Sequence, residues 1–296
     1  MKDYKVNYID LSTGERLAYR EAGSGGNTIV LIHGNMSSSV HYQILMELLE
    51  KDYKVYAPDM IGFGDSSYNR QVRSLRDFSR DIVEFIKVLD LRDIYLMGWS
   101  TGGGVAMEVA ADIPERIKKL FLQSSVSVEG YPVYQKDSMF RPIMDNRIFR
   151  REDIAIDPIL VLPALNAYKS ANRSYFKYVW DATIYNHKKP SDEDYEKYLD
   201  AIMKQRNIVD VNVCLANFNI SSSFNGVVRG SGRIDLIKAP VVIFHGDKDL
   251  IIPIEQGLLS KKHFGDQAQL VVFKGMGHSL LTDNLDKFYR TFIDKL

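Results

Sequence analysis

The sequence has little of what would connect it with an oxidising compartment or a polyanionic partner. Its 296 residues include a single cysteine, Cys214, so no disulfide can form within the chain. Lysine and arginine together number 38, aspartate and glutamate also number 38, and the formal net charge is zero. Because a balanced chain has no overall attraction for phosphate groups, we do not expect a nucleic acid as a partner.

Long apolar runs are also missing. The uncharged apolar stretches fall far short of the roughly 20 residues that cross a bilayer. The opening residues, MKDYKVNYID, carry charges where a signal peptide needs an apolar segment. We therefore expect a soluble, cytoplasmic protein with no membrane span. The hydrophobic fraction of 45% is enough for the large core of one α/β domain with an insertion.

What the sequence does contain is an alternation of short apolar runs with amphipathic stretches, which is typical of strands joined by crossover helices in a mostly parallel sheet. Residues 6–11 and 16–21 flank a turn-rich joint and predict an opening hairpin. A helix is expected over 101–111, and one last helix carries the apolar stripe between 281 and 293. The expected buried strands are residues 28–32, 53–57, 94–97, 120–122, 241–244 and 270–273.

The alternation stops between residues 125 and 236, where apolar and aromatic residues occur in helix-like groups. We interpret this segment as a helical cap inserted into a core domain formed by residues 1–124 and 237–296. Ser191, three residues before Asp194, resembles a capping box that begins a helix. We expect some of the large apolar residues of the cap to pack on the core and others to line a pocket; for any single one the alternative is that it only holds the cap together. They are Met139, Phe140, Met144, Phe149, Tyr175, Phe176 and Trp180.

The clearest chemical signal is Gly98-Trp99-Ser100-Thr101-Gly102, a GxSxG motif placed where a strand leads directly into a helix. A sharp turn at this point strains the central residue, and small neighbours let its hydroxyl project above the sheet. The alternative, an ordinary serine at a glycine-rich helix start, fits the bare motif but not its context. We therefore predict Ser100 as a nucleophile.

A serine hydroxyl needs a base that takes its proton, and six histidines are available. His278 lies in a glycine-rich loop between the last strand and the last helix, at the sheet edge where such folds hold their sites. We therefore predict His278 as the base. The alternative is a loop histidine with a structural hydrogen bond.

The carboxylate that orients this base should follow a strand and precede the histidine. Asp247 and Asp249 both do so, and we favour Asp249 because Asp247, directly after the strand, suits a turn-capping role. Glu129, after the strand that ends near residue 124, is a third and weaker candidate.

The order Ser, Asp, His along the chain is that of the α/β-hydrolases, and three further segments resemble that superfamily. Residues 32–35 (IHGN) resemble its oxyanion segment, residues 59–66 (DMIGFGDS) its DxxGxGxS turn, and residues 246–253 (GDKDLIIP) its acid loop. The resemblance covers the chain except the cap. It implies an eight-stranded, mostly parallel sheet flanked by helices, and a catalytic triad of Ser100, Asp249 and His278 that needs no cofactor or metal.

In that family two backbone N–H groups hold the oxyanion, and the matching residues here are Asn35 and Thr101, with Met36 as the alternative to Asn35. Phe63, Trp99 and Met276 are candidates for lining the substrate pocket, with core packing as the equal alternative. The serine argues against epoxide hydrolases and haloalkane dehalogenases, which use aspartate at that position.

The leading hypothesis is a carboxylesterase-like enzyme that cleaves a small or medium uncharged ester. A carbon–carbon bond hydrolase of a diketone-like substrate, a lactonase and an acyl transferase use the same residues and remain alternatives. A ligand receptor on the same fold is the alternative outside enzymes.

Overall fold

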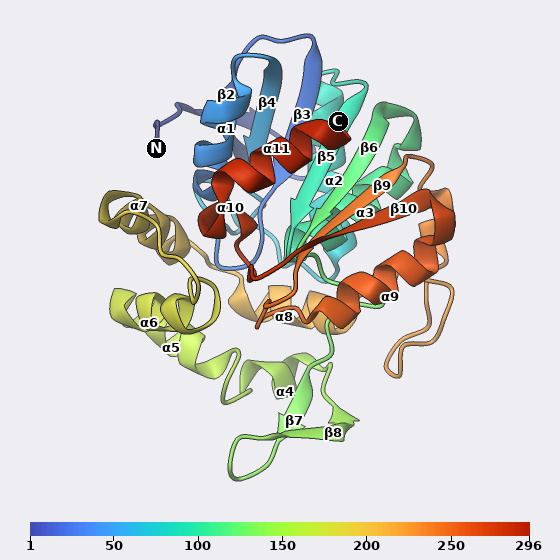
Figure 1. Ribbon diagram of the computed structural model, residues 1–296. Coiled ribbons are helices and arrows are strands. Elements are labelled where there is room, and N and C mark those ends of the chain that lie inside the picture. The colour runs from blue at the N-terminus through green and yellow to red at the C-terminus, as the bar shows by residue number, and fades with distance from the viewer.

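A twisted eight-stranded β-sheet runs through the computed structural model, which describes residues 1–296 (Figure 1). The strands follow the order β1-β2-β4-β3-β5-β6-β9-β10. β2 runs antiparallel to both of its neighbours, and the pairs from β4 to β10 are parallel. The predicted mostly parallel sheet with its opening hairpin is confirmed. The strands are β1 Val6–Asp10, β2 Arg16–Ala22, β3 Asn27–Ile32, β4 Tyr53–Pro58, β5 Ile94–Trp99, β6 Ile117–Gln123, β9 Val241–Gly246 and β10 Ala268–Phe273.

Helices cover both faces of this sheet, because its strands are apolar on both sides. In β3, Val30 and Ile32 belong to the core on one face, whereas Ile29 and Leu31 belong to the core on the other. The first face packs against α2 (Leu75–Val88), α3 (Thr101–Asp112) and α9 (Ile254–Phe264); the second packs against α1 (Gln43–Leu49), α10 (Leu280–Asp283) and α11 (Leu285–Lys295). Short 3₁₀ helices complete the core: η1 Ser39–Tyr42, η2 Pro114–Arg116, η3 Arg233–Leu236 and η4 Gly265–Gln267.

The C-terminal helical region differs from the single helix that its apolar stripe predicts. It is divided at Asn284, whose side-chain oxygen accepts the Lys287 N–H at 3.0 Å and so caps the start of α11. Asparagine is among the preferred N-cap residues, and this cap competes with continuation of the preceding helix.

Residues 125–236, here called the inserted segment, lie between β6 and β9 and cover the carboxyl ends of the strands (Figure 1). Ser191 caps α7 by accepting the Asp194 N–H at 3.2 Å, whereas the Asp194 carboxylate binds the terminal ammonium of Met1 instead of closing a capping box. None of the helices combines the length and the apolar character that a membrane crossing needs. The segment contains β7 Tyr134–Lys136, β8 Pro142–Arg147, α4 Arg151–Ala155, α5 Leu162–Lys169, α6 Arg173–Thr183, α7 Asp192–Met203 and α8 Ile208–Ala216.

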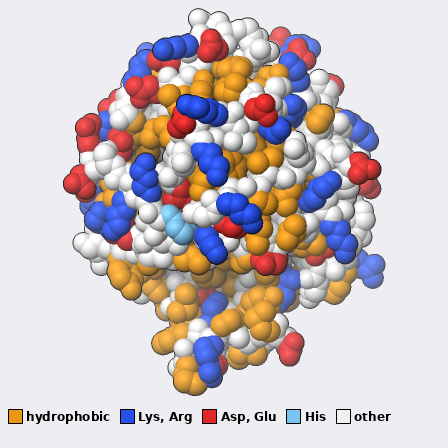
Figure 2. Space-filling model, viewed as in Figure 1, with side chains coloured by type: hydrophobic (Ala, Val, Ile, Leu, Met, Phe, Trp, Pro, Cys, Tyr) orange, Lys and Arg blue, Asp and Glu red, His pale blue; other side chains and the backbone are white.

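The hairpin of β7 and β8 is a feature that the sequence did not predict. Asp137 closes its turn, because its carboxylate accepts the N–H groups of Met139 and Arg141 at 2.8 and 3.0 Å. Met139, Phe140 and Met144 are 63%, 59% and 63% exposed, so they are not among the cap residues that pack on the core. Phe149 is 41% exposed and lines a hollow beside the hairpin, whereas Phe176 and Trp180 are fully buried in the core on the α1 and α11 face. The hairpin projects at the lower end of the molecule, where Figure 2 shows apolar side chains on the surface.

Candidate active site

Ser100 lies at the tip of a strained turn between β5 and α3. Its φ and ψ angles are 57° and −121°, a conformation that non-glycine residues adopt only where the surroundings impose it. The flanking glycines leave no room for a side chain. A Cβ at Gly98 would lie 2.2 Å from the Gly102 carbonyl oxygen, and one at Gly102 would lie 2.3 Å from the Ile32 carbonyl oxygen. The strand therefore meets the helix closely enough to raise Ser100 above the sheet.

His278 and Asp249 form a hydrogen-bonded pair at the same edge of the sheet. His278 Nδ1 donates to Asp249 Oδ2 at 2.8 Å, and the other carboxylate oxygen accepts the N–H groups of Ile251 and Ile252, each at 2.9 Å. Burial raises the pKa of Asp249, but the charge and hydrogen bond of His278, with the Ile252 N–H, outweigh it and bring the pKa below its ordinary value. The carboxylate is thus ionised and aimed at the imidazole.

Trp99 connects this pair with the serine. Its indole N–H donates to the His278 carbonyl oxygen at 3.1 Å, and the two rings lie 5.5 Å apart. Because Trp99 directly precedes Ser100, the contact holds the histidine loop beside the nucleophile turn. Neither Ser100 Oγ nor His278 Nε2 has a hydrogen-bond partner in the protein.

The other two carboxylates considered from the sequence have partners of their own. Asp247 accepts the Gly275 N–H at 2.7 Å and lies 3.4 Å from Lys274 Nζ, which is the turn role expected for it. Glu129 Oε1 lies 2.8 Å from His263 Nε2, so it pairs with a different histidine. Of the three carboxylates, only Asp249 is bonded to His278.

The loop after β3 brings backbone N–H groups to the serine. A Cβ built on Gly34 would lie 3.6 Å from Ser100 Oγ, which places this loop directly against the hydroxyl. The Asn35 N–H has no acceptor in the protein, whereas the Met36 N–H donates to Gln205 Oε1 at 2.9 Å. Thr101 is the first residue of α3, where an N–H has no partner inside the helix. The free amides are therefore those of Asn35 and Thr101, and Met36 is occupied.

Comparison with known proteins agrees with the fold described above. The family model described as alpha/beta hydrolase fold matches residues 27–285. The chain belongs to the α/β-hydrolase fold family. It is 26% identical to a non-heme haloperoxidase from Rhodococcus erythropolis, over 94% of this chain and 95% of that protein. It is 24% identical to the 2-hydroxymuconate semialdehyde hydrolase of Pseudomonas sp. (strain CF600), over 94% of this chain and 89% of that protein.

A solved structure gives the same fold. An esterase from Exiguobacterium antarcticum superposes on this hydrolase with a TM-score of 0.75 and 18% identity, over 97% of this chain and 98% of that chain. At this identity the likeness concerns the fold.

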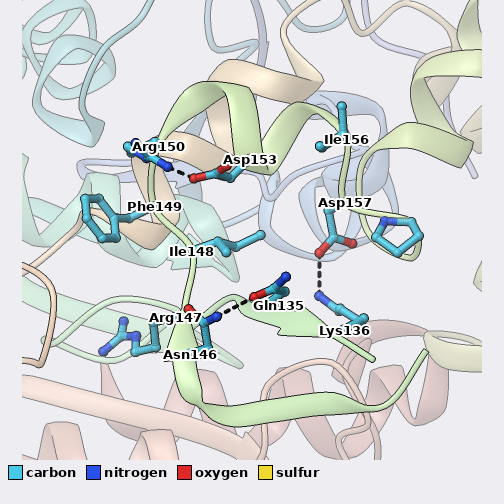
Figure 3. Close-up of a pocket in the computed structure, with 11 residues that line it drawn as sticks. Gln135, Lys136, Asn146, Arg147, Ile148, Phe149, Arg150, Asp153, Ile156 and Asp157 are labelled. Carbon is cyan, nitrogen blue, oxygen red and sulfur yellow. Dashed lines mark hydrogen bonds and ion pairs between the residues drawn. The ribbon is translucent and has the colours of Figure 1, made fainter. Parts of the chain in front are cut away.

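The site of this hydrolase is closed in the structure. Ser100 and Asp249 are each 8% exposed and His278 is 2% exposed. A hollow of about 690 Å³ lies elsewhere, between the β7–β8 hairpin and the turn after α4 (Figure 3). Its lining is mainly polar, with Lys136 paired to Asp157 and Arg150 to Asp153, and it includes none of the candidate catalytic residues. The candidate catalytic residues thus lie apart from this hollow.

The three candidate lining residues are all buried. Phe63 is fully buried, with its ring centre 5.0 Å from that of His33 and 6.1 Å from that of Phe78, which is the contact pattern of core packing. Met276 is 5% exposed and belongs to the core on the α1 and α11 face. Trp99 lines a cavity of only about 10 Å³, too small for an ester. Pocket lining by these residues stays a prediction.

Gln205 contacts the loop beside Ser100, and no sequence pattern predicts this contact. It follows α7 in the inserted segment and is 4% exposed, yet its side chain reaches the loop after β3. The surrounding run Lys-Gln-Arg-Asn matches no motif. Its contacts are considered below.

Proposed function

We propose that this hydrolase is a serine esterase that cleaves a small or medium uncharged carboxylic ester through an acyl-enzyme intermediate. The observation that carries the proposal is the buried Asp249–His278 hydrogen bond beside a serine in a strained strand-to-helix turn. This combination suits acyl transfer, because a carboxylate holds the tautomer of a histidine whose loop is bonded to Trp99, next to the serine.

In the proposed mechanism each group has one step. Asp249 accepts a hydrogen bond from the His278 Nδ1–H, which leaves the lone pair of Nε2 to take the Ser100 proton as Oγ attacks the ester carbonyl. The N–H groups of Asn35 and Thr101 then stabilise the oxyanion, and the imidazolium returns its proton to the leaving alcohol. Water hydrolyses the acyl-enzyme by the same route and restores Ser100.

The side chains that the inserted segment places near Trp99 favour an uncharged substrate. The Trp180 ring lies 6.3 Å from that of Trp99, and Tyr185 and Tyr198 line the same small cavity as Trp99. Aromatic surroundings bind apolar acyl or aryl groups and disfavour an unpaired charge. Peptides and polyanions are therefore poor candidates.

Carbon–carbon bond cleavage is the second candidate. It is supported by the similarity to 2-hydroxymuconate semialdehyde hydrolase over most of both chains. The two candidates share the serine and the histidine and differ in the bond that breaks, so substrate tests separate them.

The test begins with a fluorophosphonate probe and continues with p-nitrophenyl esters of graded chain length and a vinylogous diketone. We expect labelling of Ser100 and fastest turnover on uncharged esters of short or medium length. Ser100→Ala should abolish both, while Ser260→Ala, a change at a buried serine on α9, should retain them. Substantial turnover by a folded Ser100→Ala protein would refute the mechanism, and faster cleavage of the diketone would favour the second candidate. Labelling without any turnover would indicate a receptor.

A further inference from the structure

The side-chain amide of Gln205 uses its full hydrogen-bonding capacity in the interior. Its Oε1 accepts the Met36 N–H at 2.9 Å and the Tyr168 hydroxyl at 3.1 Å. Its Nε2 donates to Asn35 Oδ1 at 2.8 Å and to Asn207 Oδ1 at 3.0 Å. An amide has two donors and two acceptor positions, so every one is occupied and the amide has a single orientation.

Two of these four bonds hold the loop that carries the proposed oxyanion donor. The Asn35 side chain and the Met36 N–H are both bound to Gln205, and the Asn35 N–H directly precedes these two points of attachment along the chain. Met36 also has a positive φ of 51°, a conformation that costs energy for a side chain of this kind and needs support from its surroundings. Gln205 supplies that support at the Met36 N–H.

The neighbours of Gln205 attach the same stretch of the inserted segment to the core. The Arg206 N–H donates to the Gly62 carbonyl oxygen at 2.8 Å, and Asn207 Nδ2 donates to the Ile61 carbonyl oxygen at 2.8 Å. The stretch therefore rests on the loops after both β3 and β4. The bonds of Gln205 thus connect the position of this stretch with the loop at Asn35.

We propose that Gln205 is a positioning residue that sets the Asn35 N–H for the oxyanion only when the inserted segment is closed over the site. The inference rests on the proposed esterase function and adds to it a residue that contacts no reacting atom. It couples closure with catalysis, because a substrate that leaves the segment open leaves the oxyanion loop without its support. If the Asn35 N–H points away from the oxyanion, it stabilises the transition state less, while binding of the substrate in the ground state is little changed.

The test compares Gln205→Met and Gln205→Glu with the matched control Gln267→Met. Gln205→Met removes all four bonds at similar size, and Gln205→Glu keeps the acceptor atoms but replaces the two donors. Gln267 is a partly buried glutamine that directly precedes β10. Its side chain donates to the carbonyl oxygens of Ile237 and Ala239, which precede β9. For each variant we would measure the melting temperature, kcat and KM on the best p-nitrophenyl ester, and the rate of fluorophosphonate labelling.

We expect both Gln205 variants to lose about ten- to a hundredfold in kcat and a similar factor in labelling rate, somewhat less than the loss of a whole oxyanion donor. KM should change by less than about threefold, as for an interaction made in the transition state. Gln267→Met should lower the melting temperature by about as much as the Gln205 variants do, and its kcat should stay near that of the wild type.

Three results would overturn the inference. One is a kcat within twofold of the wild type in both Gln205 variants. Another is a loss of kcat that follows the loss of stability and that Gln267→Met shows as well. The third is a raised KM at constant kcat in the Gln205 variants. Failure of the proposed function is seen separately, in a wild-type chain that is neither labelled nor active on any ester.

Discussion

His41 should make the stability of this protein fall steeply in mild acid. It lies in η1 at 6% exposure, stacked on Tyr198 with ring centres 4.3 Å apart, and its ring centre lies 5.1 Å from that of Trp180. Neither ring nitrogen has a hydrogen-bond partner. Burial, with a smaller contribution from His33, lowers the pKa of His41 to about 3. In the unfolded chain an ordinary histidine has a pKa of about 6.5.

The direction in which stability changes with pH follows from the number of protons that the folded and unfolded chains bind. Between these two pKa values the unfolded chain binds a proton that the folded chain does not, so stability is fully present above about pH 6.5 and is lost as the pH falls toward 3. At 1.36 kcal/mol per unit, the loss from His41 alone is about 2 kcal/mol at pH 5. That is a large part of a typical total of about 5–15 kcal/mol.

The assay is urea unfolding at pH 7.5 and pH 5 for the wild type, His41→Phe and His187→Gln. His33 and His245 also have lowered pKa values because of burial, so every chain should lose stability in acid. The loss should be about 2 kcal/mol smaller in His41→Phe, which cannot take up the proton. His187→Gln, a change at an exposed histidine, should behave as the wild type. Equal losses in the wild type and His41→Phe would refute the reasoning.

Two further predictions concern the candidate site. Asp249→Asn should lower kcat by about 10⁴-fold, because the imidazole is then held in the wrong tautomer. Asp247→Asn and Glu129→Gln should keep a kcat within about tenfold of the wild type. A reversed ranking of the three variants in steady-state kinetics would show that the acid is misassigned. Gly102→Ala should destabilise the protein by several kcal/mol in chemical unfolding, because the alanine Cβ would meet the Ile32 carbonyl oxygen at 2.3 Å. At Gly26 a Cβ has open space, so Gly26→Ala should be near neutral. Equal stabilities of the two variants would contradict the packing argument.

Much of the fold could be predicted because its signals are local. Most buried strands contain a short apolar run, as in β3 and β5, and the turn at Ser100 carries glycines that backbone contacts require. Gly102 shows the reason directly, since its neighbours leave no space for a Cβ. The Asp249–His278 contact was expected from the position of each residue after a strand, and the structure places the two side chains in contact. Their catalytic roles stay a prediction.

The remaining features depend on tertiary contacts that leave no periodic pattern. The β7–β8 hairpin has exposed side chains on both faces, so it lacks the alternation by which a strand is recognised. The division at Asn284 follows from one capping side chain inside an apolar stripe. Gln205 meets Asn35 across 170 residues of sequence, a distance over which spacing carries no information.

His41 and Gln205 show how the inserted segment can hold the site closed and still open. Both lie where the segment meets the core, but they hold it by different means. The stack of His41 on Tyr198 is apolar and tolerates small shifts, whereas the four bonds of Gln205 require one orientation. A small displacement of the segment would therefore leave the aromatic contact largely intact and break the amide contacts first. Loss of oxyanion geometry should then precede loss of the closed fold, which makes the amide the more sensitive reporter of closure.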